Sequence, residues 1–159
     1  MDSDILHIYT DGACSGNPGR GGWGVYIEKG IEKIELNGSD EDTTNNRMEL
    51  VAVIQALRYV DQNSKIKLFT DSKYVMQGIQ EWILKWKTND WKTANKKDVK
   101  NKDLWMDLDE LVELHNIDWI WVKGHSGDFG NEIADKLATS AISNYCLLYT
   151  SPSPRDPNR

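Results

Sequence analysis

Apolar and polar residues follow two different periods along this chain. Short runs of β-branched and aromatic residues that alternate with polar ones are typical of strands, and longer runs with apolar residues on one face are typical of helices. The predicted strands are residues 5–10, 25–29, 31–38, 65–70 and 117–124, and the predicted helices are residues 40–60, 72–86, 103–115 and 132–142.

The segment between the first two predicted strands has a different composition. Residues 12–24, GACSGNPGRGGWG, hold six of the twelve glycines and one proline, which predicts a turn or bulge. The resulting order β-β-β-α-β-α-α-β-α predicts an α/β fold with one mixed sheet and helices on its faces.

Length and composition restrict the class of protein. The 159 residues, 39% hydrophobic and 28% charged, suit one domain with its own core. No apolar run approaches the roughly 20 residues that span a bilayer, and the acidic start lacks the features of a secretory signal, so we expect no membrane partner. Cys14 and Cys146 form neither a disulfide framework nor a CxxC pair, which favours a reducing cytoplasm.

The C-terminal segment differs from the rest of the chain. Residues 146–159 hold three of the four prolines and show no periodicity, which is typical of disorder. The stretch CLLYTSPSPRD also resembles the translation of a transposon adapter from sequencing libraries. We therefore expect one domain over residues 1–145, and a non-native tail without function over residues 146–159.

Four acidic residues lie at strand ends or on apolar helix faces, where a carboxylate does not stabilise an apolar core. Asp11 and Asp71 each follow a Thr at the end of a predicted strand, and Glu49 and Asp135 share apolar stripes of predicted helices. If the two strands are neighbours and both helices pack on one face of the sheet, the four carboxylates converge.

Each acid also has a simpler interpretation when taken alone. Asp11 precedes a glycine and could form a turn, and Asp71 could cap the next helix. Glu49 could belong to a capping box with Asn46, and Asp135 could pair with a lysine. Their joint placement favours a shared site.

A shared site requires a cation, because unit charges about 4 Å apart repel by ~4 kcal/mol at an effective dielectric constant near 20. Carboxylate oxygens suit Mg²⁺ or Mn²⁺, and no Cys/His cluster indicates zinc. Two such ions ~3.5–4 Å apart can hold an attacking water and a leaving oxygen on either side of a phosphate.

Charge is distributed unevenly along the chain. The net charge is −6, yet residues 85–102 hold seven lysines against two aspartates, so that stretch carries +5 and the remainder −11. Six of the seven tryptophans lie between residues 82 and 121. Core packing accounts for Trp86 and Trp105, whereas lysines interleaved with tryptophan favour contact with a nucleic-acid backbone.

Five motifs together identify a family. They are YTDGACSGNPG at 9–19, TTNNRMEL at 43–50, TDSKYV at 70–75, the Trp- and Lys-rich residues 82–102, and VKGHSGDFGNEIAD at 122–135. With these motifs in this order, the chain closely resembles type 1 ribonuclease H, the bacterial single-domain form. The resemblance implies a ribonuclease H-like fold, with a mixed five-stranded sheet and helices on both faces. It also implies a monomeric, metal-dependent endoribonuclease that cleaves the RNA strand of RNA–DNA hybrids, leaving 5′-phosphate and 3′-hydroxyl ends.

The resemblance also assigns roles to residues. Asp11, Glu49, Asp71 and Asp135 match the carboxylates that hold two Mg²⁺ ions, for which Mn²⁺ is a possible substitute. His125 matches the catalytic histidine, in a loop with three glycines, and can transfer a proton to the leaving 3′-oxygen or help product release. The matching substrate contacts are Cys14, Gly16, Asn17, Thr44, Asn45, Asn46, Trp82, Lys87, Lys96, Lys97 and Lys100.

Two other functions stay open at this point. A related nuclease of the same superfold would accept an all-DNA substrate, and a non-catalytic hybrid-binding module would bind hybrids without cleaving them. The four acids argue against the binding module, because a binder has no reason to hold mutually repelling carboxylates. Nucleotide binding through GACSGNPG is weak, since the stretch lacks the P-loop GK[ST] and does not fit GxGxxG.

Overall fold

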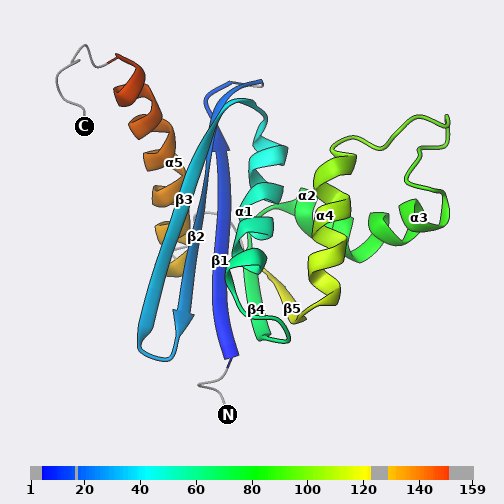
Figure 1. Ribbon diagram of the computed structural model, residues 1–159, viewed down its shortest axis with the longest axis horizontal. Coiled ribbons are helices and arrows are strands. Elements are labelled where there is room, and N and C mark those ends of the chain that lie inside the picture. The colour runs from blue at the N-terminus through cyan, green and yellow to red at the C-terminus, as the bar shows by residue number, and fades with distance from the viewer. Residues whose placement is uncertain (1–4, 17, 123–128, 151–159) are drawn as a thin grey trace.

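A computed structural model describes residues 5–16, 18–122 and 129–150, without the side chains of 143–150. Its elements follow the predicted order (Figure 1). They are β1 (Ile5–Cys14), β2 (Gly19–Lys29), β3 (Glu32–Thr43), α1 (Asn45–Tyr59), β4 (Lys65–Thr70), α2 (Lys73–Gln77), η2 (Gly78–Trp82), α3 (Ile83–Thr88), α4 (Lys102–Glu113), β5 (Asn116–Trp121) and α5 (Phe129–Thr150).

The five strands form one mixed sheet in the order β3-β2-β1-β4-β5. β1, β2 and β3 pair antiparallel, whereas β4 pairs parallel with both β1 and β5. The mixed five-stranded sheet predicted from the sequence is therefore confirmed.

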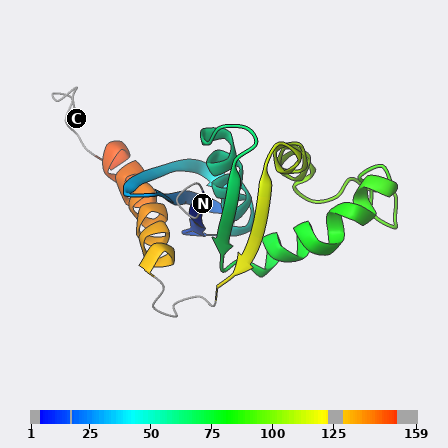
Figure 2. The ribbon, with the colours of Figure 1, turned by 90° about the horizontal axis from the view of Figure 1, so that it is seen from below.

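Helices α1 and α5 cover opposite faces of this sheet (Figure 2). Alternate residues of a strand point to opposite faces. Leu6 and Ile8 join the core cluster that includes Leu50 and Val53 of α1, whereas the ring of Tyr9 lies against Gly130 of α5. The helices on both faces agree with the predicted fold class. The arrangement supposed for the convergence of the acids, with the helices of Glu49 and Asp135 on one face, is not observed.

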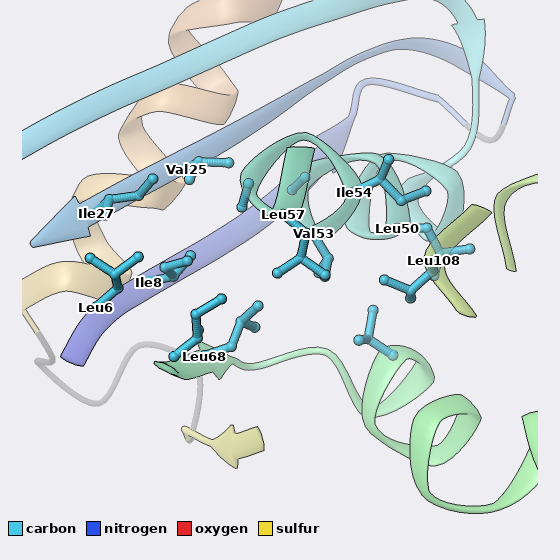
Figure 3. Packing of buried hydrophobic residues seen from close by; sticks show 14 of the residues in the cluster. Leu6, Ile8, Val25, Ile27, Leu50, Val53, Ile54, Leu57, Leu68 and Leu108 are labelled. Atoms are coloured by element: carbon cyan, nitrogen blue, oxygen red, sulfur yellow. The ribbon is translucent and has the colours of Figure 1, made fainter. Parts of the chain in front are cut away.

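The main core fills the space between the sheet, α1 and α4 (Figure 3). Ile8, Leu50, Val53 and Leu68 are completely buried there. Apolar residues at three- and four-residue spacing along α1 face alternate residues of β1, β2 and β4, which is the pattern that the sequence predicts. This packing fixes α1, and with it Glu49, against the sheet.

The glycine-rich segment contains the predicted turn, between β1 and β2, and a register shift of the β2–β3 pair between Gly19 and Gly21, but most of it is strand. β1 continues to Cys14, and β2 begins at Gly19. A methyl group at Gly22 would overlap the carbonyl oxygen of Ala138, and one at Gly24 would overlap that of Ala134. The glycines are therefore needed where α5 lies directly on β2, and only the short connection between the strands is a turn.

The predicted helix over residues 72–86 is interrupted in its middle. Residues Gly78–Trp82 form a π-helical turn between α2 and α3. A side chain at Gly78 would overlap the indole ring of Trp105, which is completely buried. The irregular turn thus accompanies close packing of this segment on α4.

At the C-terminus, α5 continues to Thr150, past the boundary expected at residue 145. Residues 151–159 lie outside the described residues. Among the residues whose side chains are described, α5 contacts Gly22 and Gly24 of β2 through residues between Ala134 and Ile142.

Candidate active site

Three carboxylates from three elements meet at one edge of the sheet. Asp11, Glu49 and Asp71 each offer an oxygen atom, and these atoms lie within 4.8 Å of one another. Asp11 and Glu49 are buried, with 6% and 8% of their surface exposed, and Asp71 is half-buried. A cluster of acids that water barely reaches indicates a functional site.

The parallel pairing of β1 with β4 brings Asp11 and Asp71 together. Tyr9 and Phe69 are partners in this pair of strands, and the two acids each lie two residues further along. Asp11 lies within β1, opposite Gly24 of β2, so it is not a turn residue. Asp71 does not cap α2, because the hydroxyl of Ser72 accepts the hydrogen bond from Val75 N–H.

Glu49 reaches the site because Gly12 has no side chain. A methyl group at Gly12 would overlap the backbone nitrogen of Glu49, so α1 lies directly against β1 at this point. The backbone N–H of Gly12 also donates to the carboxylates of Asp11 and Glu49. Thr44 is the N-cap of α1, which excludes the capping-box role considered for Glu49. Sequence reasoning did not assign a role to Gly12, although its place in YTDG was the available signal.

Asp135 approaches from α5, on the other face of the sheet. Its side chain is hydrogen-bonded to that of Asp11, which lies on the same face. Strand alternation explains this, because Asp11 is two residues from Tyr9 and opposite Gly24, and both of those contact α5. Four carboxylates therefore surround the edge of the sheet from two faces.

Burial and like charges raise the pKa values of these acids. Burial, the hydrogen bond with Asp135 and the negative charges of Asp71 and Asp135 together raise the pKa of Asp11 from 3.8 to about 8. Burial and the charges of Asp11 and Asp71 hold the pKa of Glu49 well above its usual 4.5. Without a counter-ion the cluster therefore retains protons at neutral pH.

The donor set fits a divalent cation. The Oε1 atom of Glu49 is buried and accepts no hydrogen bond from any described residue. The clustered donors are carboxylate oxygens, which are the ligands of hard cations such as Mg²⁺ and Mn²⁺. Such an ion would satisfy the Glu49 oxygen and remove the repulsion between the carboxylates.

The end of β1 and the turn after it hold two described residues that the sequence predicts as substrate contacts, Cys14 and Gly16. Ser15 N–H donates to the carbonyl of Arg20 at 2.7 Å, and the Cys14 thiol lies 3.5 Å from the carbonyl oxygen of Thr43. Gly16 is exposed in this turn, whereas Asn17 lies outside the described residues. The thiol of Cys14 is thus half-buried and contacts the protein itself, whereas Gly16 is exposed.

Thr44, Asn45 and Asn46 form the N-terminus of α1. The hydroxyl of Thr44 accepts from Arg47 N–H at 3.2 Å, which is the capping role that the sequence alone allowed. Asn45 and Asn46 are exposed in the first turn. Their amide groups can both donate and accept hydrogen bonds.

Trp82 belongs to a cluster of aromatic rings. Its ring centroid lies 5.7 Å from that of Tyr74 and 5.8 Å from that of Trp86, and the ring remains half-buried. Trp105 is buried, and Trp86 packs against the core cluster, as predicted for both.

Helix α3 and the residues after it extend away from the sheet (Figures 1 and 2). Lys96, Lys97 and Lys100 are exposed here, and none has an ion-pair partner among the described residues. Lys87 differs, because its Nζ atom lies 3.3 Å from Asp109 and 3.7 Å from Glu113 of α4. Of the four predicted lysine contacts, Lys87 therefore already has partners within the protein.

His125 lies outside the described residues, and its catalytic role stays a prediction. Asp11, Glu49 and Asp135 lie in the described elements β1, α1 and α5, and Asp71 directly follows β4.

Comparison with known proteins identifies the family. The sequence model of the RNase H family matches residues 3–143, which is most of the chain. The chain belongs to the RNase H family. Members of this family are metal-dependent hydrolases, which agrees with the acidic cluster at the sheet edge.

Relatives in this family match nearly the whole domain. A protein named Ribonuclease H from Francisella tularensis subsp. novicida (strain U112) is 58% identical over 136 residues, covering 85% of this chain and 89% of that protein. The Ribonuclease H of Francisella philomiragia subsp. philomiragia is 57% identical over the same coverage. The family resemblance inferred from the five motifs is thus confirmed.

Solved structures show the same fold. The crystal structure of LC9-RNase H1, described as a type 1 RNase H with the type 2 active-site motif, has a TM-score of 0.80 at 32% identity and covers 89% of this chain and 73% of that chain. LC11-RNase H1, crystallised in complex with an RNA/DNA hybrid, has a TM-score of 0.66 at 24% identity, covering 89% of this chain and 99% of that one. At 24% identity, the LC11-RNase H1 structure supports the fold only. No described helix is long and apolar enough to cross a membrane.

Proposed function

We propose that this RNase H family member hydrolyses the RNA strand of RNA–DNA hybrids with Mg²⁺, leaving 5′-phosphate and 3′-hydroxyl ends. The observation that carries the proposal is the convergence of Asp11, Glu49 and Asp71 within 4.8 Å, with Asp135 hydrogen-bonded to Asp11. Family membership supports the hydrolytic activity, and the 58% identical Ribonuclease H supports the substrate.

Asp11, Glu49, Asp71 and Asp135 would hold two Mg²⁺ ions, with Mn²⁺ as a possible substitute. Bound there, the ions would activate a water and stabilise the leaving oxygen of the scissile phosphate. Asp11 lies between the other acids, contacting Asp135 on its own face and sharing the Gly12 amide with Glu49, so it is the residue best placed to bridge both ions. His125 would pass a proton to the leaving 3′-oxygen.

Recognition of the hybrid would be divided between two surfaces. Cys14, Gly16 and Asn17, with Asn45 and Asn46, would contact the minor groove, where the 2′-hydroxyl is both donor and acceptor. Thr44 would face a DNA phosphate, and Trp82 would lie beside the DNA strand. Lys96, Lys97 and Lys100 would contact phosphates, whereas Lys87 would do so only by exchanging its partners Asp109 and Glu113.

The test is cleavage of an end-labelled RNA–DNA hybrid with Mg²⁺, compared with duplex DNA and duplex RNA. Asp11→Asn is the variant, and Asp61→Asn, an exposed aspartate after α1, is the matched control. We expect cleavage of the RNA strand in the hybrid alone, lost in Asp11→Asn and retained in Asp61→Asn.

The other outcomes separate the alternative functions. Cleavage of duplex DNA would indicate another nuclease of the same superfold. Binding of the hybrid without cleavage would indicate a binding module. Isothermal titration calorimetry of the protein with Mg²⁺ alone checks the metal site independently of activity. A cytoplasmic location stays the prediction made from the two isolated cysteines.

A further inference from the structure

Four aromatic rings form a row between the sheet and the first turn of α5. Tyr9 of β1 and Phe69 of β4 are partners in the parallel pair, and their rings stack with centroids 4.5 Å apart and planes inclined by 12°. On the β2 side, the ring of Tyr26 lies 6.0 Å from that of Tyr9. Phe129, the first residue of α5, meets Tyr26 edge-on at 6.3 Å. The row therefore crosses three neighbouring strands and ends at the helix.

The ring of Tyr9 is held in this row from three directions. Phe69 stacks on it, and Tyr26, which is completely enclosed with 1% of its surface exposed, lies beyond it. A methyl group at Gly130 of α5 would overlap ring atoms of Tyr9, so the helix backbone touches the ring directly. Offset stacking of two rings favours one relative orientation, so Phe69 fixes the plane of the Tyr9 ring.

Helix α5 rests on the sheet in two different ways. At Gly130 the ring of Tyr9 lies between the helix and its strand. One turn later, the carbonyl oxygen of Ala134 lies directly over Gly24, with no side chain between helix and strand. The first turn is therefore held further from the sheet than the second. A spacer of different thickness under Gly130 would change the inclination of the helix.

Asp135 is placed where this inclination matters. It directly follows Ala134, little more than one turn after Gly130. Its side chain is hydrogen-bonded to that of Asp11, which lies two residues beyond Tyr9 on the same face of β1. A change in the inclination of α5 therefore changes the distance between these two carboxyl groups.

The location of the rings distinguishes them from ordinary core packing. The main core cluster, as far as the described residues define it, includes none of the four rings and lies on the opposite face of the sheet. Phe69 is only half-buried, and it lies two residues before Asp71, just as Tyr9 lies two residues before Asp11. The stacked pair thus lies directly beside the acidic cluster.

We propose that Phe69 is a positioning residue for Asp135. By holding the Tyr9 ring under Gly130, it keeps the first turn of α5 at the height at which Asp135 reaches the metal site. Phe69 itself touches neither metal nor hybrid in this account. The inference rests on the proposed function, because it requires Asp135 to take part in binding Mg²⁺.

The test variant is Phe69→Leu, which keeps an apolar side chain and removes the flat ring, and Phe69→Tyr is the conservative variant that retains the ring. Ile66→Val is the matched control, because Ile66 lies on the same strand but is buried in the core on the opposite face. Phe69→Leu is made in the parent protein and in Asp135→Ala. The measurements are Kd for Mg²⁺ alone by isothermal titration calorimetry, Tm in EDTA, and kcat and KM for the hybrid at low and high Mg²⁺.

We expect Phe69→Leu to raise Kd for Mg²⁺ about tenfold in the parent, as is typical when a residue that orients a metal ligand is lost. In Asp135→Ala the same change should alter Kd less than twofold, because the residue it positions is absent. In the parent, kcat should fall at low Mg²⁺ and recover at high Mg²⁺, while KM for the hybrid stays the same. Phe69→Tyr should restore the parent Kd, and Ile66→Val should lower Tm without changing Kd.

Gly130→Ala tests the same contact from the side of the helix. In the parent its methyl group meets a ring that Phe69 holds in place, so α5 is displaced and Mg²⁺ binding weakens. In Phe69→Leu the Tyr9 ring can yield, so the double variant should bind Mg²⁺ no more weakly than Phe69→Leu alone. Additive losses would show that the two residues do not act through one contact, and would overturn the proposal.

The remaining contrary results are distinct. An equal effect of Phe69→Leu in both backgrounds, or a lower Tm with an unchanged Kd for Mg²⁺, would also overturn the positioning role. If Asp135→Ala itself leaves Kd unchanged, Asp135 is not a metal ligand and the inference fails, whereas hybrid cleavage by the parent protein tests the proposed function separately. Should Phe69→Leu not fold at the assay temperature, Gly130→Ala in the parent and in Asp135→Ala gives the same comparison.

Discussion

Asp11 and Glu49 place two carboxyl groups where burial opposes their ionisation. The backbone N–H of Gly12 donates to both, which favours the charged forms, but burial is the larger influence on each pKa. Near neutral pH, full ionisation of the two acids therefore requires a cation that supplies the missing positive charge. Metal binding and folding are coupled through these side chains.

At the residue scale, we predict that Asp11→Asn stabilises the metal-free protein, increasingly so as the pH rises. The pKa of Asp11 is raised from 3.8 to about 8, so its protonated form favours folding below about pH 4, and this contribution is lost as the pH rises to 8. Asparagine does not titrate. We expect a gain of about 1–2 kcal/mol, or about 3–6 °C in Tm, above pH 8 and little gain near pH 4.

Thermal unfolding in EDTA across this pH range checks the prediction, with Asp61→Asn as the control. Adding Mg²⁺ should then raise the Tm of the parent more than that of Asp11→Asn. A pH-independent difference between the parent and Asp11→Asn would show that the buried carboxyl is not the cause.

At the scale of elements, the contact of α5 with β2 decides how close Asp135 comes to Asp11. The carbonyl groups of Ala134 and Ala138 lie directly over Gly24 and Gly22, and Asn37 of β3 donates to the Leu137 carbonyl at 2.9 Å. Asp135 follows Ala134, and Gly24 is the β2 partner of Asp11. The absence of a side chain at residue 24 thus sets the distance between helix and strand at the site itself.

We predict that Gly24→Ala both destabilises the fold and impairs catalysis. The added methyl group would displace α5, at a cost of about 1–3 kcal/mol, and would move Asp135 away from Asp11. Denaturant unfolding gives the stability, and hybrid cleavage at a temperature where the variant stays folded gives kcat. Lys33→Ala, at an exposed position of β3, is the control and should change neither value. Full activity of folded Gly24→Ala would contradict this account.

At the scale of the whole molecule, charge separates into an acidic body and a basic projection. Residues 85–102 carry +5, while the rest carries −11. Part of the positive charge is neutralised locally, because Lys87 pairs with α4, and Lys92 and Lys102 with Asp98. Lys96, Lys97 and Lys100 stay exposed on the projection and are the lysines best placed to meet a polyanion.

We predict that the Lys96→Gln, Lys97→Gln, Lys100→Gln variant binds hybrids more weakly and with less dependence on salt. Each phosphate contact contributes roughly 0.9 to the slope of log K against log salt, so the slope should decrease by about 2–3. The matched control carries Lys29→Gln, Lys33→Gln and Lys65→Gln, the same change of charge on exposed residues of β2, β3 and β4. Equal slopes for the two variants would contradict specific contact by the projection.

We also predict that deletion of residues 146–159 leaves kcat/KM within about twofold of the parent value. The family match ends at residue 143, and among the residues whose side chains are described, α5 contacts the sheet glycines between Ala134 and Ile142. Cleavage assays and Tm of the shortened protein check this. A large loss of activity at unchanged Tm would show that the tail takes part in the reaction.

Local patterns in the sequence were sufficient for the order of the elements and for the family. Period-two and helical spacing depend only on near neighbours, so the strand at Lys65–Thr70 was predicted with its observed bounds. The helix containing Glu49 was predicted from residue 40 but begins at Asn45, because β3 continues to Thr43. The motifs around the acids also predicted which side chains the structure brings together. The predictions for Asn17 and His125 concern residues outside the described part of the chain.

Only the tertiary structure decided the remaining features, because they depend on segments far apart in the sequence. The glycines of residues 19–24 predicted a turn or bulge by composition. A register shift does occur between Gly19 and Gly21, but these glycines lie in a strand on which α5 packs. The sequence predicts Lys87 as a phosphate contact like the other lysines, but in the structure it pairs with Asp109 and Glu113 of α4. The hydrogen bonds of Asn101 with Arg47 and Tyr74 could not be predicted from local patterns, because these partners lie 54 and 27 residues away in the sequence. The sequence by itself determined the elements and the chemistry of the acids, whereas packing between distant segments determined how closely those acids and the proposed substrate contacts are held.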